Sequence, residues 1–172
     1  MSDKYDCTAD VVKHKGKVEY WLKDFAQQLT DRARIHDDSK LREPEKSIFD
    51  AWTPNLRRVQ FGGDEYKQAL TAMGEGLKHH YENNRHHPEH YPNGLNDMTI
   101  VDLIEMFCDW IAAAEEKKSS IDIAYLSVRF GIGPQLAEIF ITTLREIDFW
   151  NEVNGVPVVS FAPITANAGT IS

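Results

Sequence analysis

Apolar residues recur at helical spacing along most of the chain. The first series falls at positions 11, 18, 22, 25 and 29. Steps of three and four residues place side chains on one face of an α-helix, so we predict a first helix from about Thr8 to Asp31. His14 lies on the same face. A lone histidine on an apolar face is more often a core residue than a ligand, unless other candidate ligands accompany it.

Proline and glycine divide the rest of the chain into shorter helical segments. After a short helix that Pro44 limits, the pattern predicts helices from about residue 64 to 80, from about residue 99, over 121–130 and over 135–151. Residues 53–63 and the segment after Arg85 are predicted to be irregular. Gly74 and Gly76 each destabilise a helix by about 1 kcal/mol relative to alanine, so we expect a bend or close packing there.

These segments together predict an all-α fold. A chain of 172 residues fits one domain, which we place at residues 1–154. Residues 155–172 are rich in small residues and contain Pro157 and Pro163, and we predict an extended or disordered tail. The only strand candidate, 156–161, has no obvious partner.

Composition narrows the classes of function. No apolar run approaches the roughly 18 residues that a membrane-spanning helix needs, and no apolar segment follows the polar N-terminus, so we expect a cytoplasmic protein without membrane contact. Cys7 and Cys108 lack metal-site spacing and are expected to be thiols. The net charge of −8 disfavours extended nucleic-acid binding. A small phosphorylated ligand is still compatible, because a metal and buried cations can create a local positive site.

Histidines are concentrated in one segment. Five of the seven, His79, His80, His86, His87 and His90, lie within residues 79–90. Imidazole is the commonest metal ligand of proteins, so this density predicts a metal site. The alternative is a solvated, histidine-rich helix end.

Further candidate ligands lie on both sides of this segment. His36 and Asp37 are adjacent, and their side chains on a helix would point about 100° apart, which suits one ion at His36 with Asp37 bridging to a second. Lys40 would share a helical face with Asp37. Asp109 lies among apolar neighbours, where burial demands a partner. Glu105 precedes it on the same acidic stripe and fits a solvated face equally well.

In chain order, the candidate ligands are His14, His36-Asp37, His79-His80, His86-His87 and Asp109. This order on a helical chain resembles the H…HD…H…H…D signature of the HD-domain superfamily, over roughly residues 10–115. The blocks HDDSK, HHYENNRHHPEHY and DLIEMFCDW more closely resemble a family of small uncharacterised proteins that is common in bacteriophages. A phage-encoded member would act in the host cytoplasm.

The resemblance implies an HD-type helical domain with one or two divalent transition metal ions, which could be Mn, Fe, Co, Ni or Zn. It assigns His14, His36, Asp37 and Asp109 to the primary site and two further histidines to a second ion. The doubled histidines leave that choice open. We prefer His80 and His87, seven residues apart, with His79, Asn84, His86 and Glu105 behind the ligands or facing the substrate.

The resemblance leaves more than one reaction class open. We expect a metal-dependent phosphohydrolase acting on a nucleotide or another small phosphorylated compound, with metal-activated water as nucleophile. Lys40 and Arg85 would hold the phosphate, and Glu45 would orient the water or accept its proton. An HD-type di-iron oxygenase and a non-catalytic, partner-binding protein with a structural metal are the alternatives. Substrate specificity is expected to depend on Trp52, Arg57, Arg58, Tyr81 and Tyr91.

Overall fold

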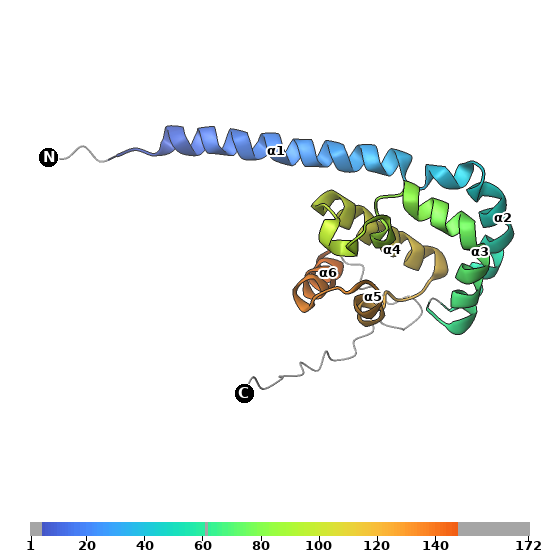
Figure 1. Cartoon of the computed structure of the whole chain (residues 1–172). Coiled ribbons are helices and arrows are strands. Elements are labelled where there is room, and N and C mark those ends of the chain that lie inside the picture. Colours follow the sequence, from blue (N-terminus) through green and yellow to red (C-terminus); the bar gives the residue numbers. More distant parts are fainter. Residues whose placement is uncertain (1–4, 61, 148–172) are drawn as a thin grey trace, which may run out of the picture. The chain divides into compact units, whose positions relative to one another are not determined.

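A computed structural model describes residues 5–60 and 62–147 (Figure 1). The regular elements of these residues are all helices, which confirms the predicted all-α fold. They are α1 (Thr8–Ile35), η1 (Asp38–Leu41), α2 (Glu45–Leu56), α3 (Asp64–Asn83), η2 (Pro88–His90), η3 (Gly94–Asp97), α4 (Ile100–Lys117), α5 (Ile123–Phe130) and α6 (Pro134–Glu146), where η marks a short 3₁₀ helix. None of the described helices is both long and apolar enough to cross a bilayer.

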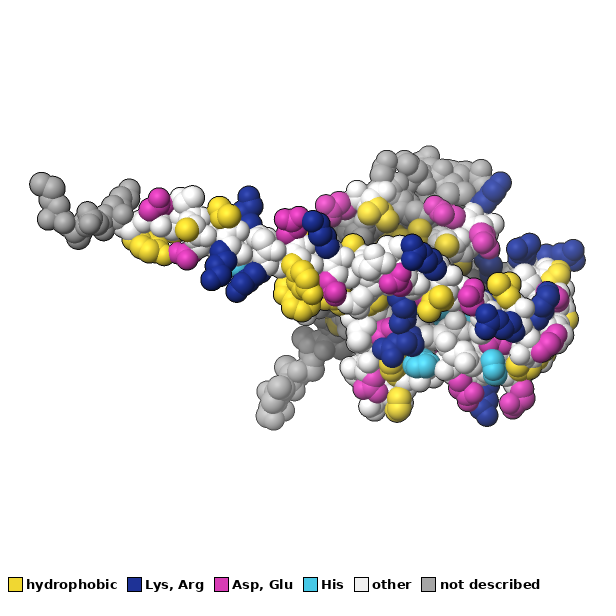
Figure 2. All heavy atoms as spheres, turned by 90° about the horizontal axis from the view of Figure 1, so that it is seen from above, with side chains coloured by type: hydrophobic (Ala, Val, Ile, Leu, Met, Phe, Trp, Pro, Cys, Tyr) yellow, Lys and Arg dark blue, Asp and Glu magenta, His cyan; other side chains and the backbone are white. Residues whose placement is uncertain are grey.

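The chain divides into two compact units, Met1–His36 and Asp37–Ser172. The first unit consists of α1, in which no residue is buried. Its apolar face, with Val18, Trp21, Leu22 and Phe25, is exposed within this unit, and Figure 2 shows apolar side chains along the helix. Side-chain pairs one turn apart, such as Lys23 with Glu19, each stabilise such a helix by about 0.2–0.5 kcal/mol.

The hydrophobic core of the second unit is formed by α4, α5 and α6. Met106, Leu126 and Leu144 are among its least exposed residues, each with at most 2% of its surface accessible. The rings of Phe107 and Phe140 stack with centroids 4.6 Å apart. Because this core holds the buried face of α4, the side chains on the other faces of α4 have fixed positions.

Helices α2 and α3 pack closely beside each other. A Cβ atom at Gly76 would lie 2.5 Å from Cδ1 of Ile48, so only glycine fits between these helices. Gly74 has a φ of 42° and interrupts the helical backbone of α3, which is the bend expected there. The close approach brings the first turn of α2 toward the last turns of α3, where His79 and His80 lie.

The segment between α3 and α4 is fixed by one buried carboxylate. Asp102 is 1% exposed and accepts hydrogen bonds from Nε and Nη2 of Arg85, both at 3.1 Å, and from the hydroxyl of Tyr91 at 2.8 Å. It also forms a capping box with Thr99 at the start of α4. Burial opposes ionisation of Asp102, but these hydrogen bonds outweigh it and lower its pKa. The loop that carries His86 is thereby held against α4.

Two predicted boundaries were wrong. Residues 53–56 belong to α2 rather than to an irregular connection, because the backbone N–H of Arg57 donates to the Thr53 carbonyl at 3.1 Å and closes the last turn around Pro54. The short helix expected before Pro44 is a 3₁₀ turn, η1, separated from α1 by the left-handed backbone of Asp37. The predicted domain end at residue 154, the strand candidate 156–161 and the tail 155–172 lie outside the described residues.

The contact between α2 and α3 yields a prediction. Gly76→Ala should lower the free energy of unfolding by about 1–3 kcal/mol, because the added methyl group overpacks against Ile48. Gly16→Ala is the matched control, since Gly16 has no atom within 4 Å of an added Cβ and alanine favours a helix by about 0.5–1 kcal/mol. Denaturant unfolding followed by circular dichroism measures both. Equal stability of the two variants would contradict the close packing.

Candidate metal centre

Asp37 occupies an unusual backbone conformation at the start of the second unit. Its φ of 60° and ψ of 13° lie in the left-handed region, which aspartate tolerates better than most residues other than glycine. The Lys40 backbone N–H donates to the Asp37 carbonyl at 2.9 Å and closes η1 behind it. The carboxylate of Asp37 is thus positioned by a short, tight turn.

Four side chains of the second unit form a cluster with the spacing of metal ligands. One ligand atom from each of Asp37, His80, His86 and His87 lies within 4.8 Å of the others. Nε2 of His80 is 2.8 Å from Nε2 of His87 and 3.4 Å from Oδ1 of Asp37. Nε2 of His86 is 3.6 Å from the same carboxylate oxygen. Three imidazoles and a carboxylate therefore face one small volume.

These distances fit a single cation. Ligand atoms about 2.0–2.1 Å from one ion, at angles between octahedral and tetrahedral, are about 2.9–3.4 Å apart. The three distances between ligand atoms, 2.8, 3.4 and 3.6 Å, lie near this range. A donor set of three histidines and one aspartate suits zinc, iron, manganese, cobalt and nickel.

Glu45 fixes the orientation of two histidines from behind. It is fully buried on the first turn of α2, and its two oxygens lie 2.7 Å from Nδ1 of His79 and 2.9 Å from Nδ1 of His80. An ionised carboxylate only accepts hydrogen bonds, so this contact favours the tautomer of His80 that carries its proton on Nδ1. Nε2 of His80 then presents its lone pair to the cluster, which is the form that binds a metal.

Glu105 orients the imidazole of His86 in the same way. Its Oε1 lies 3.2 Å from Nδ1 of His86, and the imidazole is 98% buried. The proton on Nδ1 leaves the Nε2 lone pair directed at Asp37. Two of the three clustered histidines are therefore backed by a carboxylate, an arrangement typical of metal-binding histidines.

A chain of hydrogen bonds also fixes the position of Glu45 beside His80. The Asn84 side chain donates to the hydroxyl of Ser39 at 2.7 Å, and that hydroxyl donates to Glu45 at 2.9 Å. Burial lowers the pKa of His80, and the nearby charge of Lys40 lowers it further. This direction favours the neutral imidazole, which is the form that binds a metal.

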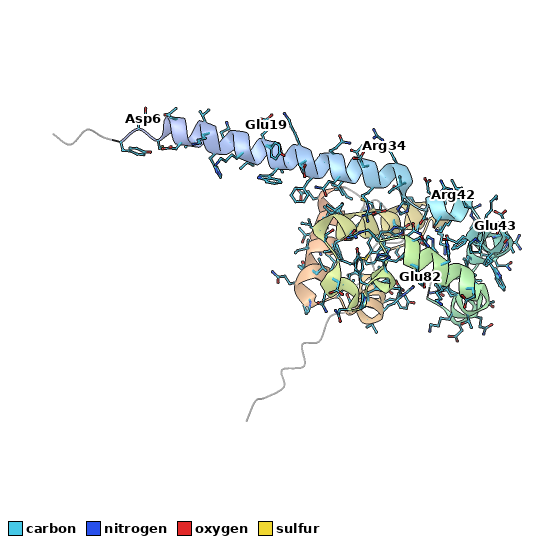
Figure 3. The ribbon with its side chains drawn as sticks, turned by 45° about the horizontal axis from the view of Figure 1, so that its top comes forward. Asp6, Glu19, Arg34, Arg42, Glu43 and Glu82 are labelled. Carbon is cyan, nitrogen blue, oxygen red and sulfur yellow. The ribbon has the colours of Figure 1, made fainter. Side chains whose placement is uncertain are left out.

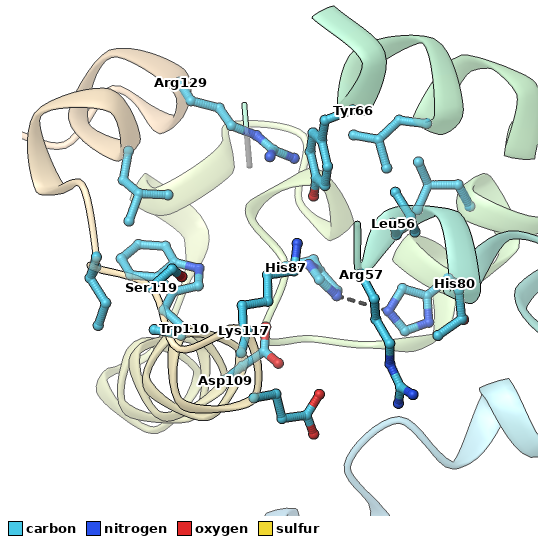
Figure 4. A pocket seen from close by; sticks show the side chains of 18 of the residues that line it. Leu56, Arg57, Tyr66, His80, His87, Asp109, Trp110, Lys117, Ser119 and Arg129 are labelled. Carbon is cyan, nitrogen blue, oxygen red and sulfur yellow. Dashed lines mark hydrogen bonds between the residues drawn. The ribbon is translucent and has the colours of Figure 1, made fainter. Parts of the chain in front are cut away.

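The cluster borders a cavity of about 320 Å³. His80, His87, Asp109 and Lys40 contribute to its wall. Figure 4 shows His80 and His87 joined by their short contact, with Trp110 and Ser119 across the cavity in this view. Nζ of Lys40 lies 2.5 Å from Oδ2 of Asp37 and 5.0 Å from the centre of the Phe49 ring.

The structure places the predicted site residues as follows. Asp37, His80 and His87 meet as predicted ligands, and His86, expected behind them, joins the same cluster. A carboxylate oxygen of Asp109 lies within 4.8 Å of one of Asp37. His14 is exposed on α1 and His36 ends the first unit, so their role as ligands stays a prediction. So does the second metal ion.

Other predicted residues have partners that suggest different roles. Glu45, expected to orient water, has both oxygens directed at histidines. Arg85, expected to bind phosphate, contacts Asp102 through two nitrogens. Of the predicted specificity residues, Arg57 and Tyr81 line the cavity, and burial raises the pKa of Tyr81 to about 12. Tyr91 instead donates to Asp102.

Sequence reasoning missed Ser39 and Asp102. Ser39 lies in the HDDSK block, so its closeness to the candidate ligands was a usable signal. Asp102 was indistinguishable from a solvated acidic residue on the surface of a helix, since its partners come from a loop.

Comparison with known proteins places this chain in a family. A model described as a family of unknown function (DUF5662) matches residues 3–146. The chain belongs to this family. No curated protein and no solved structure matches it. The resemblance of this DUF5662 member to the HD-domain superfamily is not tested by these comparisons and stays a prediction.

The position of Glu45 yields a prediction about metal affinity. Glu45→Gln keeps the shape but removes one of the two acceptors, so metal affinity should fall about 10- to 100-fold. Glu43→Gln is the matched control, since Glu43 is exposed and points away from the unit (Figure 3). Calorimetric titration of the metal-free protein with Mn²⁺ or Zn²⁺ measures both variants. Equal affinities would contradict the role of Glu45 in orienting the histidines and would favour the water-orienting role expected from the sequence.

Proposed function

We propose that this protein is a metal-dependent phosphohydrolase that acts on a small phosphorylated compound. The observation that carries the proposal is a cluster of Asp37, His80, His86 and His87 that contacts buried carboxylates and of which His80 and His87 line a cavity. A divalent ion held there would lower the pKa of a bound water and screen charge on the phosphoryl oxygens.

The residues around the cluster divide into two tasks in this proposal. Glu45 and Glu105 hold the imidazoles of His80 and His86 with their Nε2 lone pairs facing the ion. The buried network around Asp102 holds the loop that carries His86. These residues act through the ligands and need not touch the substrate.

Lys40 is the proposed phosphate anchor. Its ammonium group lies at the cavity wall beside Asp37, and one third of the side chain is exposed. A phosphate at the metal centre would meet this charge without a large movement of the lysine. Arg85, the other anchor expected from the sequence, has its guanidinium group directed at Asp102.

The cavity favours catalysis over a purely structural metal. Four protein ligands would close a tetrahedral zinc site, whereas an octahedral ion such as Mn²⁺ held by the same four ligands would keep two positions for water or substrate. Here His80 and His87 belong both to the cluster and to the cavity wall. The cavity wall carries four cations, Lys40, Arg57, Lys117 and Arg129, and three carboxylates, Asp109, Glu116 and Asp122. Together with a bound metal ion, this balance favours an anionic substrate and hence phosphate hydrolysis over the oxygenase alternative.

The decisive experiment measures phosphate release by the Mn²⁺-loaded protein from a panel of nucleotides and other phosphomonoesters. Asp37→Ala should lose bound metal and activity together. Lys40→Met should keep metal and fold but lower kcat/KM about 10- to 100-fold, because it removes a charge-assisted contact worth roughly 1.5–3 kcal/mol.

Lys46→Met is the matched control, since Lys46 is exposed and pairs with Asp50 on α2. It should leave kcat/KM unchanged. Metal-loaded protein that releases no phosphate from any member of the panel would contradict the proposed function. Equal kinetics of the two lysine variants would contradict the role of Lys40 alone.

A further inference from the structure

Resting on the proposed function, we infer that the substrate is a phosphate monoester with an apolar, preferably aromatic, ester group, and that Ala113 sets the size limit for that group. The inference comes from the part of the cavity beyond the metal cluster. It narrows the expected substrate class, because a nucleotide would instead place a ribose in this region.

One face of α4 gives the cavity its length. Asp109, Ala113 and Lys117 are spaced by four residues and all line the cavity. At 1.5 Å per residue, Asp109 and Lys117 are separated by about 12 Å along the helix. Since a carboxylate oxygen of Asp109 lies within 4.8 Å of one of Asp37, a phosphate bound at the cluster leaves room for a group about the size of one aromatic ring along this face.

The walls next to this face are apolar. Trp110 and Phe130 stack at 5.8 Å with an interplanar angle of 11°, and both line the cavity. Across from α4, the cavity is lined by aliphatic residues of α2 and α3, namely Leu56, Leu70, Met73 and Leu77. Flat and aliphatic walls suit an aromatic ring, whose burial is favourable without any hydrogen bond.

A ribose fits these walls poorly. Its hydroxyl groups would leave water for walls that are largely apolar, and the side chains of Tyr66 and Tyr81, which also line the cavity, already pair with Arg129, so binding would be weakened. Polar residues recur at the far end, where Lys117, Ser119 and Asp122 line the cavity. A polar substituent on the far side of a ring would reach them.

Ala113 is the small residue between the two ends. It lines the cavity and is exposed, so its methyl group faces open space rather than a packed core. A larger side chain there would occupy the volume proposed for the ester group and would leave the cluster intact. Ala112 offers a matched control, since it is exposed on the same helix but does not line the cavity.

Binding of two non-hydrolysable phosphonates to the Mn²⁺-loaded full-length protein tests the inference by calorimetry. Phenylphosphonate and methylphosphonate carry the same anionic group and differ in the apolar group. The wild type should bind phenylphosphonate at least 10-fold more tightly. Ala113→Leu should remove that advantage while keeping metal content and methylphosphonate affinity, and Ala112→Leu should behave as the wild type.

Three outcomes would overturn the inference: equal or absent binding of the two phosphonates by the wild type, tighter binding of adenosine monophosphate than of phenylphosphonate, or equal effects of the two leucine variants. The comparison of ligands on the wild type decides the matter even if Ala113→Leu misfolds. Because the measurement is binding, a lack of phosphate release would contradict only the proposed hydrolase activity.

Discussion

A single buried carboxylate orders the candidate metal centre. Glu45 has no exposed surface, and it reaches the imidazoles of both His79 and His80 across the contact between α2 and α3. Its acceptor character sets the tautomer of His80 and so decides which nitrogen faces the cluster. The fit of Gly76 against Ile48 is what allows α2 to come close enough for this contact. The metal site thus depends on helix packing as much as on its ligands.

Burying the polar and charged groups of the cluster costs folding free energy, which a bound cation would offset. His80 and His86 are each 1% exposed, and they share a small volume with the carboxylate of Asp37. Polar groups gathered away from water destabilise a fold unless their hydrogen-bonding or electrostatic needs are met. Lys40 meets part of that need at Asp37. A bound metal would meet the rest, so folding and metal binding are expected to be coupled.

Residue type and spacing along the sequence predicted much of this site. Contacts between segments that are distant in the sequence could not be predicted from them. The sequence favoured His80 and His87 on their seven-residue spacing, and they meet because α3 ends at Asn83 and the chain turns back within a few residues. Glu45 was singled out, but its contact with histidines 34 and 35 residues later depends on packing that no spacing reveals. The apolar pattern gave no hint that Ala113 faces a cavity, because a small residue fits a packed helix equally well.

Titration of the metal-free, full-length protein with Co²⁺, followed by visible absorption, tests the central claim most directly. His87 and His90 lie in the same segment, but only His87 belongs to the cluster, while Nδ1 of His90 contacts the Tyr81 carbonyl at 2.9 Å. His87→Ala should abolish or greatly weaken the cobalt spectrum, and His90→Ala should preserve it. Identical spectra and affinities for wild type and His87→Ala would contradict a metal site at this cluster.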